Sequence, residues 1–141
     1  PDDERQSILA QAVDKARSAP TLSLAIDALL ALEAWDEARE RLLGDASGLS
    51  SVRYPTLIRW AEAFERGGQP LASALCYRAL LEDILDEGRT RAYGHAARYY
   101  RALGKLDAGI DDYRGRVDHP AYEAWLRDQH GRKRSFWQRL A

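Results

Sequence analysis

Apolar residues recur three and four positions apart along most of this chain, a spacing typical of helices with one buried face. The strict apolar–polar alternation of strands is scarce, and Ala, Leu, Arg and Glu, which favour helices, dominate the composition. Between residues 4 and 18, for example, one helical face carries Ile8, Leu9, Ala12, Val13 and Ala16. The pattern predicts an all-α fold of about eight or nine helices in antiparallel hairpins.

Capping residues predict where the first helices begin and end. Thr21 is a candidate N-cap for a helix that continues to about residue 33. The next helix is predicted to begin near Trp35 and to fade by Gly44, and residues 44–55 form the longest predicted loop.

Prolines and glycines divide the middle of the chain. Pro55 and Pro70 each stand in the first turn of a predicted helix, the position that proline favours, and Gly88 ends the second of these helices. Thr90 is a candidate cap for the following helix, which we expect to end at Gly104.

The last third of the chain is predicted to hold three short helical segments. The first spans residues 107–113. The sequence Asp118-His119-Pro120 caps and starts the second, which Gly131 ends, and residues 132–141 form the terminal segment.

A repeat of small residues connects the predicted hairpins. Glu33 and Gly67 are 34 residues apart, and so are Ala38 and Ala72. A third unit continues the series at a longer spacing, with Gly104 and Ala108. Small residues at turns and at close helix contacts are what stacked hairpins require.

This period resembles the tetratricopeptide repeat. Ala38 and Ala108 match its small positions less closely than the residues of the second unit, which are Gly67, Ala72 and Ala79. The resemblance implies a short stack of hairpins over residues 21–113, with a concave surface like that family's peptide groove. An irregular helical bundle with a chance spacing is the alternative.

The sequence predicts a single helical-repeat domain over residues 1–141. Residues 1–20 form its N-terminal helix, residues 21–113 its repeat hairpins and residues 114–141 its capping helices. Because the chain contains no methionine and opens on Pro1, we expect it to be the C-terminal part of a longer protein.

The composition argues against several classes of protein. A single cysteine, Cys76, lies in an apolar run, so we expect a buried thiol, no internal disulfide and a reducing, cytoplasmic environment. No apolar run of about 18 residues could span a membrane. His95, His119 and His130 lack the spacing of a metal motif, and no nucleophile or phosphate-loop motif is present. We therefore expect no enzymatic activity, metal or cofactor.

Charge is unevenly distributed, although the net charge is only −1. Residues 1–50 carry a net charge of −5, whereas residues 114–141 carry +4. This distribution could steer an acidic partner to the C-terminal end but falls short of the basic signature of a DNA-binding domain.

A stripe of cations is predicted on the helix after Thr90. Arg91, His95, Arg98 and Arg101 fall on one helical face. If the tetratricopeptide alignment holds, Arg91, Arg98 and Arg101 lie on the concave surface and bind a peptide with acidic side chains or a C-terminal carboxylate. Glu62 and Glu65 of the preceding hairpin would then set the charge polarity of this peptide-binding surface. The alternative is that these arginines are solvated or pair with acidic residues of the preceding helix, Glu82, Asp83, Asp86 and Glu87.

The segment "HGRKRSFW" supports two interpretations. As a structural cap, His130 ends a helix, Gly131 adopts the left-handed conformation after it, and Phe136 and Trp137 pack on the preceding hairpin. As a nucleic-acid patch, Trp137 stacks on a base while the cations contact phosphates: Arg127, Arg132, Lys133, Arg134 and Arg139. We favour the cap. A contact with an upstream domain is a third possibility.

The C-terminal half also resembles known sequences. It is similar to the end of an uncharacterised bacterial family of large helical proteins and to the C-terminal helical region of bacterial SWIM zinc-finger proteins. The matching residues are His119, Tyr122, Leu126, Arg127, His130, Arg132, Lys133, Phe136 and Trp137. One cysteine cannot supply the ligands of the zinc finger itself. The resemblance implies a helical-repeat fold and brings no activity with it.

These features lead to one functional expectation. We expect a non-enzymatic protein- or peptide-interaction module, a scaffold, within a larger bacterial cytoplasmic protein. Its partner would be a peptide or an upstream domain of the same chain, without membrane association. Nucleic-acid association through the basic C-terminal segment is the alternative.

Overall fold

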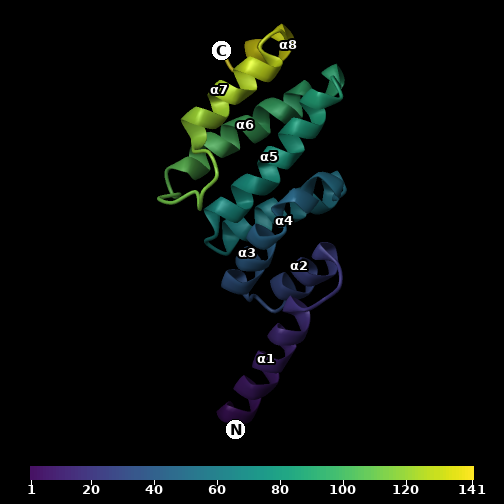
Figure 1. Ribbon diagram of the computed structural model, residues 1–141, viewed down its shortest axis with the longest axis vertical. Coiled ribbons are helices and arrows are strands. Elements are labelled where there is room, and N and C mark those ends of the chain that lie inside the picture. Colours follow the sequence, from purple (N-terminus) through teal and green to yellow (C-terminus); the bar gives the residue numbers. More distant parts are fainter.

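The computed structural model describes residues 1–141 and contains eight α-helices, two short 3₁₀ helices and no strand, which confirms the predicted all-α class. The molecule is elongated, with its two termini at opposite ends (Figure 1). The elements are α1 (Asp2–Arg17), α2 (Leu22–Ala31), α3 (Trp35–Gly44), η1 (Ala46–Ser51), α4 (Tyr54–Arg66), α5 (Pro70–Asp86), η2 (Thr90–Ala92), α6 (Tyr93–Asp107), α7 (His119–His130) and α8 (Arg134–Gln138).

Helices that follow one another in the chain pack together. The main contacts join α2 to α3, α4 to α5, and α5 to α6, and α8 packs on α6. One connected core runs through these helices, and its largest fully buried side chains include Trp60, Phe64, Leu81, Leu85 and Phe136. Burial of these apolar side chains is the main stabilising contribution.

Most of the predicted helix ends are confirmed. The Thr21 side chain accepts a hydrogen bond from the Leu24 N–H, and the Asp118 side chain accepts one from the Ala121 N–H. These caps satisfy N–H groups that have no partner within the helix. Prolines lie in the first turns of α4 and α5, as expected.

The turn that ends α2 and the turn that ends α4 lie 35 residues apart, one more than the predicted spacing of 34. Glu33, after α2, has the left-handed conformation. After α4 the residue with this conformation is Gly68, not Gly67. Both turns close with the same kind of hydrogen bond, in which the N–H of the residue just before the next helix donates to the carbonyl five residues earlier: Ala34 to the Leu29 carbonyl, and Gln69 to the Phe64 carbonyl. The turn after α5 closes in the same way, from Arg89 to the Ile84 carbonyl, so this bond is a common helix ending and not a mark of a repeat.

Gly67 is required for a different reason. Its backbone is right-handed, but a Cβ at this position would overlap the indole ring of Trp35. The turn between α4 and α5 thus packs directly on the start of α3. Ala38 and Ala72 are fully buried, as the prediction of small packing residues requires.

Four local predictions are wrong. Thr90 does not cap α6 but begins η2, and Gly104 lies inside α6, which continues to Asp107. The predicted loop 44–55 contains η1. Gly131 adopts a right-handed conformation, with φ −60° and ψ −23°, and its lack of a side chain matters for another reason, since a Cβ there would overlap the Arg127 carbonyl oxygen.

Residues 107–113 do not form the predicted helix. After α6 the chain is irregular up to Asp118, and Arg114 and Gly115 both have positive φ. Ala108, assigned to the third repeat unit, is exposed. Glycines at 109 and 115 disfavour helix propagation in this stretch, and side-chain contacts to distant residues hold it instead.

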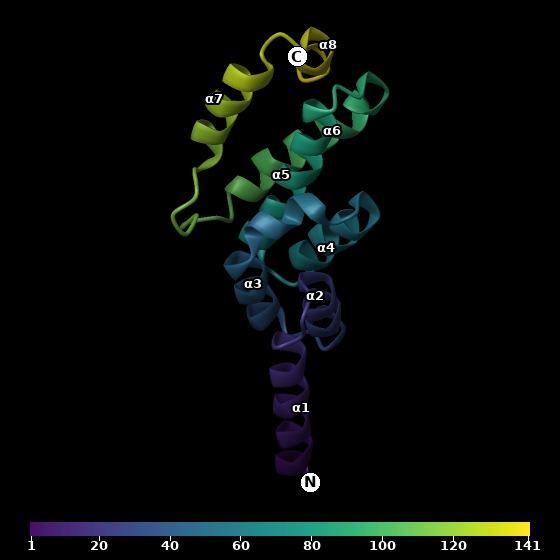
Figure 2. The same cartoon turned by 45° about the vertical axis from the view of Figure 1, so that its right-hand side comes forward.

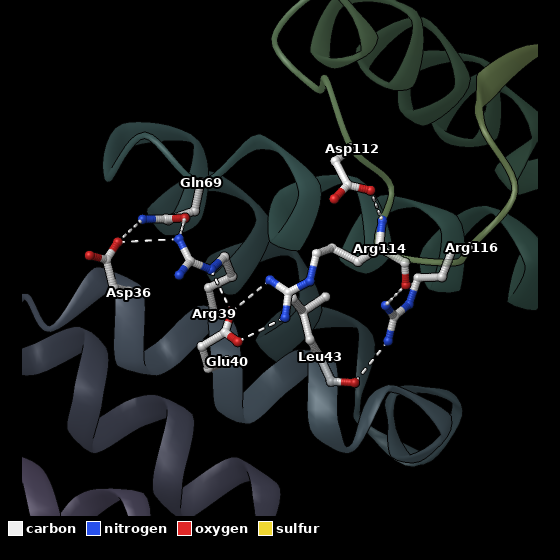
Figure 3. Close-up of polar contacts among 8 residues, drawn as sticks. All are labelled: Asp36, Arg39, Glu40, Leu43, Gln69, Asp112, Arg114 and Arg116. Carbon is white, nitrogen blue, oxygen red and sulfur yellow. Dashed lines mark hydrogen bonds and ion pairs between the residues drawn. The ribbon is translucent and has the colours of Figure 1, made fainter.

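Arginines fasten this loop to α3, which is far away in sequence (Figure 3). Arg114 donates two hydrogen bonds, of 3.0 and 2.9 Å, to the carboxylate of Glu40, and Arg116 donates one of 2.8 Å to the Leu43 carbonyl. The Arg114 and Arg39 guanidinium groups lower the pKa of Glu40 to about 2. The arginine hydrogen bonds therefore join α3 to the segment between α6 and α7.

A buried arginine fixes the other side of the loop. The guanidinium of Arg78 on α5 lies 5.2 Å from the ring centroid of Tyr113 and 4.3 Å from that of Tyr122 on α7, and it donates to the Val117 carbonyl at 2.9 Å. Burial lowers the pKa of Arg78. These cation–π contacts join α5, the loop and α7.

Candidate peptide-binding groove

A groove with a volume of about 590 Å³ lies between α4 and α6. Both helices pack on α5, and their parallel course leaves the space between them open. The groove is mostly apolar, with side chains from η1, α4, α5 and α6, among them Leu49, Leu57, Ile58, Leu80, Ile84 and Tyr99. A concave apolar surface of this size is typical of a ligand or peptide site.

Cations surround this apolar surface. Arg53, Arg89 and Arg98 all line the groove, whereas its one carboxylate, Asp83, is paired with Arg89. Arg53 and Arg98 form no ion pair, so their charges are free to bind a ligand. Arg98 also lies 2.6 Å from Nδ1 of His95.

The local structure explains why these cations converge. Arg53 directly precedes α4, and Arg89 directly precedes η2 and α6. Because α5 runs antiparallel between α4 and α6, the starts of those two helices lie at the same end of α5 (Figure 2). The sequence prediction considered only the stripe on α6 and missed Arg53 and Arg89. Because α4 and α6 run in the same direction, their first residues lie at the same end of α5, and this relation could have identified Arg53 and Arg89.

The three arginines of the predicted stripe separate in the structure. Arg98 lines the groove, Arg91 lies exposed in η2, and Arg101 donates a hydrogen bond to the Arg139 carbonyl beyond α8. None of the three pairs with the acidic end of α5, so the predicted pairing is wrong. Asp83 binds Arg89, Glu82 accepts from the Tyr122 hydroxyl, and Asp86 lies 3.3 Å from Nε2 of His130.

Glu62 and Glu65 lie beyond the groove, one and two turns after Ile58 on α4, and are exposed. Burial raises the pKa of Tyr77, and the charges of Glu65 and Glu62 raise it further. The Tyr77 ring lies 5.8 Å from that of Tyr99, which lines the groove. The acidic residues therefore continue the line of the groove, away from its cationic end.

The C-terminal aromatics pack against α6. Phe136 is fully buried, with its ring centroid 6.1 Å from that of Tyr93. Trp137 is half-buried, and its Nε1 donates to the His130 carbonyl at 2.9 Å. His130 itself is buried, and this burial lowers its pKa. The segment from His130 to Trp137 thus covers the end of the stack.

Several cations of the predicted basic patch make structural contacts within the chain. Arg127 pairs with Glu123 at 3.1 Å, and its guanidinium lies 4.2 Å from the Trp137 ring centroid. Lys133 lies 2.9 Å from Nδ1 of His130. The side chain of Arg139 reaches across to Gly94 on α6. Exposed cations without an ion pair are Arg132, Arg134 and Arg139.

Three further observations concern metal ligands, the cysteine and membrane-spanning helices. No group of three His, Cys, Asp or Glu side chains is placed to hold a metal ion. Cys76 is fully buried, and burial raises the pKa of its thiol far above the usual range. None of the helices combines the length and the apolar character needed to cross a bilayer.

The chain belongs to a family of unknown function, DUF6880, whose family model matches residues 1–139. No curated protein and no solved structure matches the chain. The family carries no described activity, so any functional conclusion depends on the groove and its charges.

Proposed function

We propose that this protein is a non-enzymatic interaction module that binds an amphipathic, acidic segment of a partner protein in the groove between α4 and α6. The proposal rests on one observation: an apolar groove of about 590 Å³ is lined by Arg53 and Arg98, neither of which has an ion-pair partner. Binding would follow the helix-in-groove mode, in which apolar side chains at helical spacing enter a hydrophobic groove.

Both the apolar and the charged parts of the groove support this class of partner. Tyr54, at its edge, is 66% exposed, and burying such a side chain under a partner is favourable. Guanidinium groups bind carboxylates through paired hydrogen bonds, which adds orientation to affinity. Since Glu62 and Glu65 continue the groove at its other end, we expect a partner that is acidic at one end and basic at the other.

Two finer properties belong to the same proposal. We propose that the pairs α2–α3 and α4–α5 are degenerate tetratricopeptide-like repeats, since their turns lie 35 residues apart and the small residues Ala38 and Ala72 are both fully buried. We also propose a bacterial cytoplasmic setting. A buried cysteine without a partner suits a reducing compartment, and the bacterial origin rests on the C-terminal resemblance.

Nucleic acid is a less favoured partner. Trp137 is held by the His130 carbonyl and by Arg127, so it is not free to stack on a base. Arg127 is itself paired with Glu123. The C-terminal cations are therefore partly occupied by structural contacts, whereas Arg53 and Arg98 are not.

The proposal is tested by selecting phage-displayed peptides on the 141-residue chain. We expect enrichment of sequences with apolar residues at helical spacing and acidic residues at one end. Fluorescence anisotropy of one selected peptide should show at least tenfold weaker binding to Arg98→Glu, because a repelling charge replaces an attractive one. The matched control is Arg132→Glu, an exposed arginine outside the groove, which should bind normally.

Two results would contradict the proposal. One is a selection without enrichment, or peptide binding that Arg98→Glu leaves unchanged. The other is tight binding of a labelled single-stranded oligonucleotide that falls steeply with salt and is weakened by Arg132→Glu, which would identify a phosphate-binding surface instead.

A further inference from the structure

Helix α1 projects from the rest of the molecule (Figures 1 and 2). Of its residues only Ala16, in the last turn, is buried, and the contacts of this helix are with α2 and α3. Its apolar face is left open: Ile8 is 60% exposed and Leu9 is 49% exposed. The acidic first turn, Asp2, Asp3 and Glu4, forms no ion pair.

An exposed apolar stripe on a projecting helix is costly in water unless another surface covers it. We propose that the projecting part of α1, residues 2–12, docks in the groove between α4 and α6 of a second copy of this chain. This inference rests on the proposed function, because it names an occupant for the same groove. The contact is head to tail, since α1 of one copy meets the groove of the next.

The charges of α1 and the groove are complementary. The docking helix carries three carboxylates in its first turn, and the groove presents Arg53 and Arg98 without ion-pair partners. In the last turn of α1 the charge reverses at Lys15, whereas Arg17 is paired with Asp14 of the same helix. Along α4 the charge changes in the opposite direction, from the cation Arg53 to the carboxylates Glu62 and Glu65. A helix laid parallel to α4 therefore meets opposite charges at both ends.

The spacing of the apolar residues agrees with this orientation. Ile8 follows Glu4 by four residues, just as Leu57 follows Arg53 by four residues. Four helical residues rise about 6 Å, so a Glu4–Arg53 contact places Ile8 beside Leu57. Further along, Lys15 comes 11 residues after Glu4, and Glu65 comes 12 residues after Arg53. One register thus aligns the acidic turn, the apolar stripe and the basic turn.

The groove of the same chain is not available to α1. Its last turn packs on α2 and α3, and the helix points away from α4, α5 and α6 (Figures 1 and 2). Only a second copy can supply the groove, and such a contact builds open chains or closed rings. A dozen helical residues bury less than about 1,200 Å² in total, which is typical of weak association.

Sedimentation velocity of the 141-residue chain over a rising concentration series tests this inference. We expect the weight-average sedimentation coefficient of the wild-type chain to increase with concentration. The double variant Ile8→Glu/Leu9→Glu, without a docking helix, should stay monomeric. So should Arg53→Glu/Arg98→Glu, without a cationic groove. Leu24→Glu, at a residue that is 58% exposed on α2, is the matched control and should associate normally.

Mixing the two monomeric variants gives the decisive measurement. Each supplies the part that the other lacks, so an equimolar mixture should form a dimer of one copy of each and nothing larger. A symmetric contact, in which both copies use the same surface, would not be restored in this way.

Four outcomes would overturn the inference: a wild-type chain that stays monomeric, association that survives Ile8→Glu/Leu9→Glu, loss of association in Leu24→Glu, or a mixture that stays monomeric. Far-UV circular dichroism establishes that each variant is folded, and all the substituted residues are exposed. If phage-selected peptides bind the groove while the wild-type chain stays monomeric, the proposed function stands and this inference fails. If no selected peptide binds the groove and the wild-type chain stays monomeric, both the proposed function and this inference fail.

Discussion

Gly67 shows how one residue position is determined by a distant side chain. A Cβ at this position would overlap the ring of Trp35, so we expect Gly67→Ala to force the α4–α5 turn away from α3. Overpacking of this kind costs about 1–3 kcal/mol. Chemical denaturation should show a lower free energy of unfolding. The control is Gly44→Ala at the end of α3, where no atom lies within 4 Å, and there alanine should be neutral or stabilising because it favours helix. Equal stabilities of the two variants would contradict the prediction.

For single residues, the sequence predicted the roles that depend on residues nearby in the chain. Thr21 and Asp118 were identified as caps because the N–H groups that they bind are three residues away. Gly67 was expected as a small residue at a turn, and it lies in one, but the side chain that requires its small size, Trp35, is far away in sequence and was not predicted. His130, expected at a helix end, is also buried, and sequence spacing alone does not reveal the packing around it.

At the scale of elements, α8 is the shortest α-helix yet its packing covers the end of α6. The Phe136 ring is fully buried and meets Tyr93 and Tyr100 edge to face. We expect Phe136→Ala to destabilise the fold by about 3–5 kcal/mol, as is usual for a buried phenylalanine. Thermal denaturation should show a clear fall in Tm, whereas Arg134→Ala, an exposed change on the same helix, should leave Tm almost unchanged. An unchanged Tm in Phe136→Ala would show that α8 is not a cap.

The elements themselves were largely predictable, because periodicity and capping are local. The main exception is residues 107–113, whose loop is held by contacts with residues distant in sequence, among them the bond from Arg114 to Glu40, 74 residues away. The groove was predictable only in part. Arg98 was found from its helical stripe, but Arg53 became part of the site only because α4 and α6 begin at the same end of α5.

At the scale of the whole molecule, the Glu40–Arg114 contact makes stability depend on pH. The Arg114 guanidinium lowers the folded-state pKa of Glu40 from 4.5 to about 2, so the unfolded chain binds a proton at Glu40 more readily than the folded chain. This contribution to stability is fully present above pH 4.5 and is lost as the pH falls through 2. Its size is modest, because both side chains are nearly half exposed and water screens the pair.

We therefore expect Glu40→Gln to reduce the loss of stability between pH 4.5 and 2, because glutamine has no proton to gain. Urea denaturation at a series of pH values measures the slope. Glu37→Gln is the matched control on the same helix, since Glu37 forms no ion pair, and it should keep the wild-type slope. Added salt should weaken the effect of Glu40 because it screens exposed charges. Identical slopes for Glu40→Gln and wild type would mean that the loop is held to α3 without Glu40, with the Arg116–Leu43 hydrogen bond as the remaining contact.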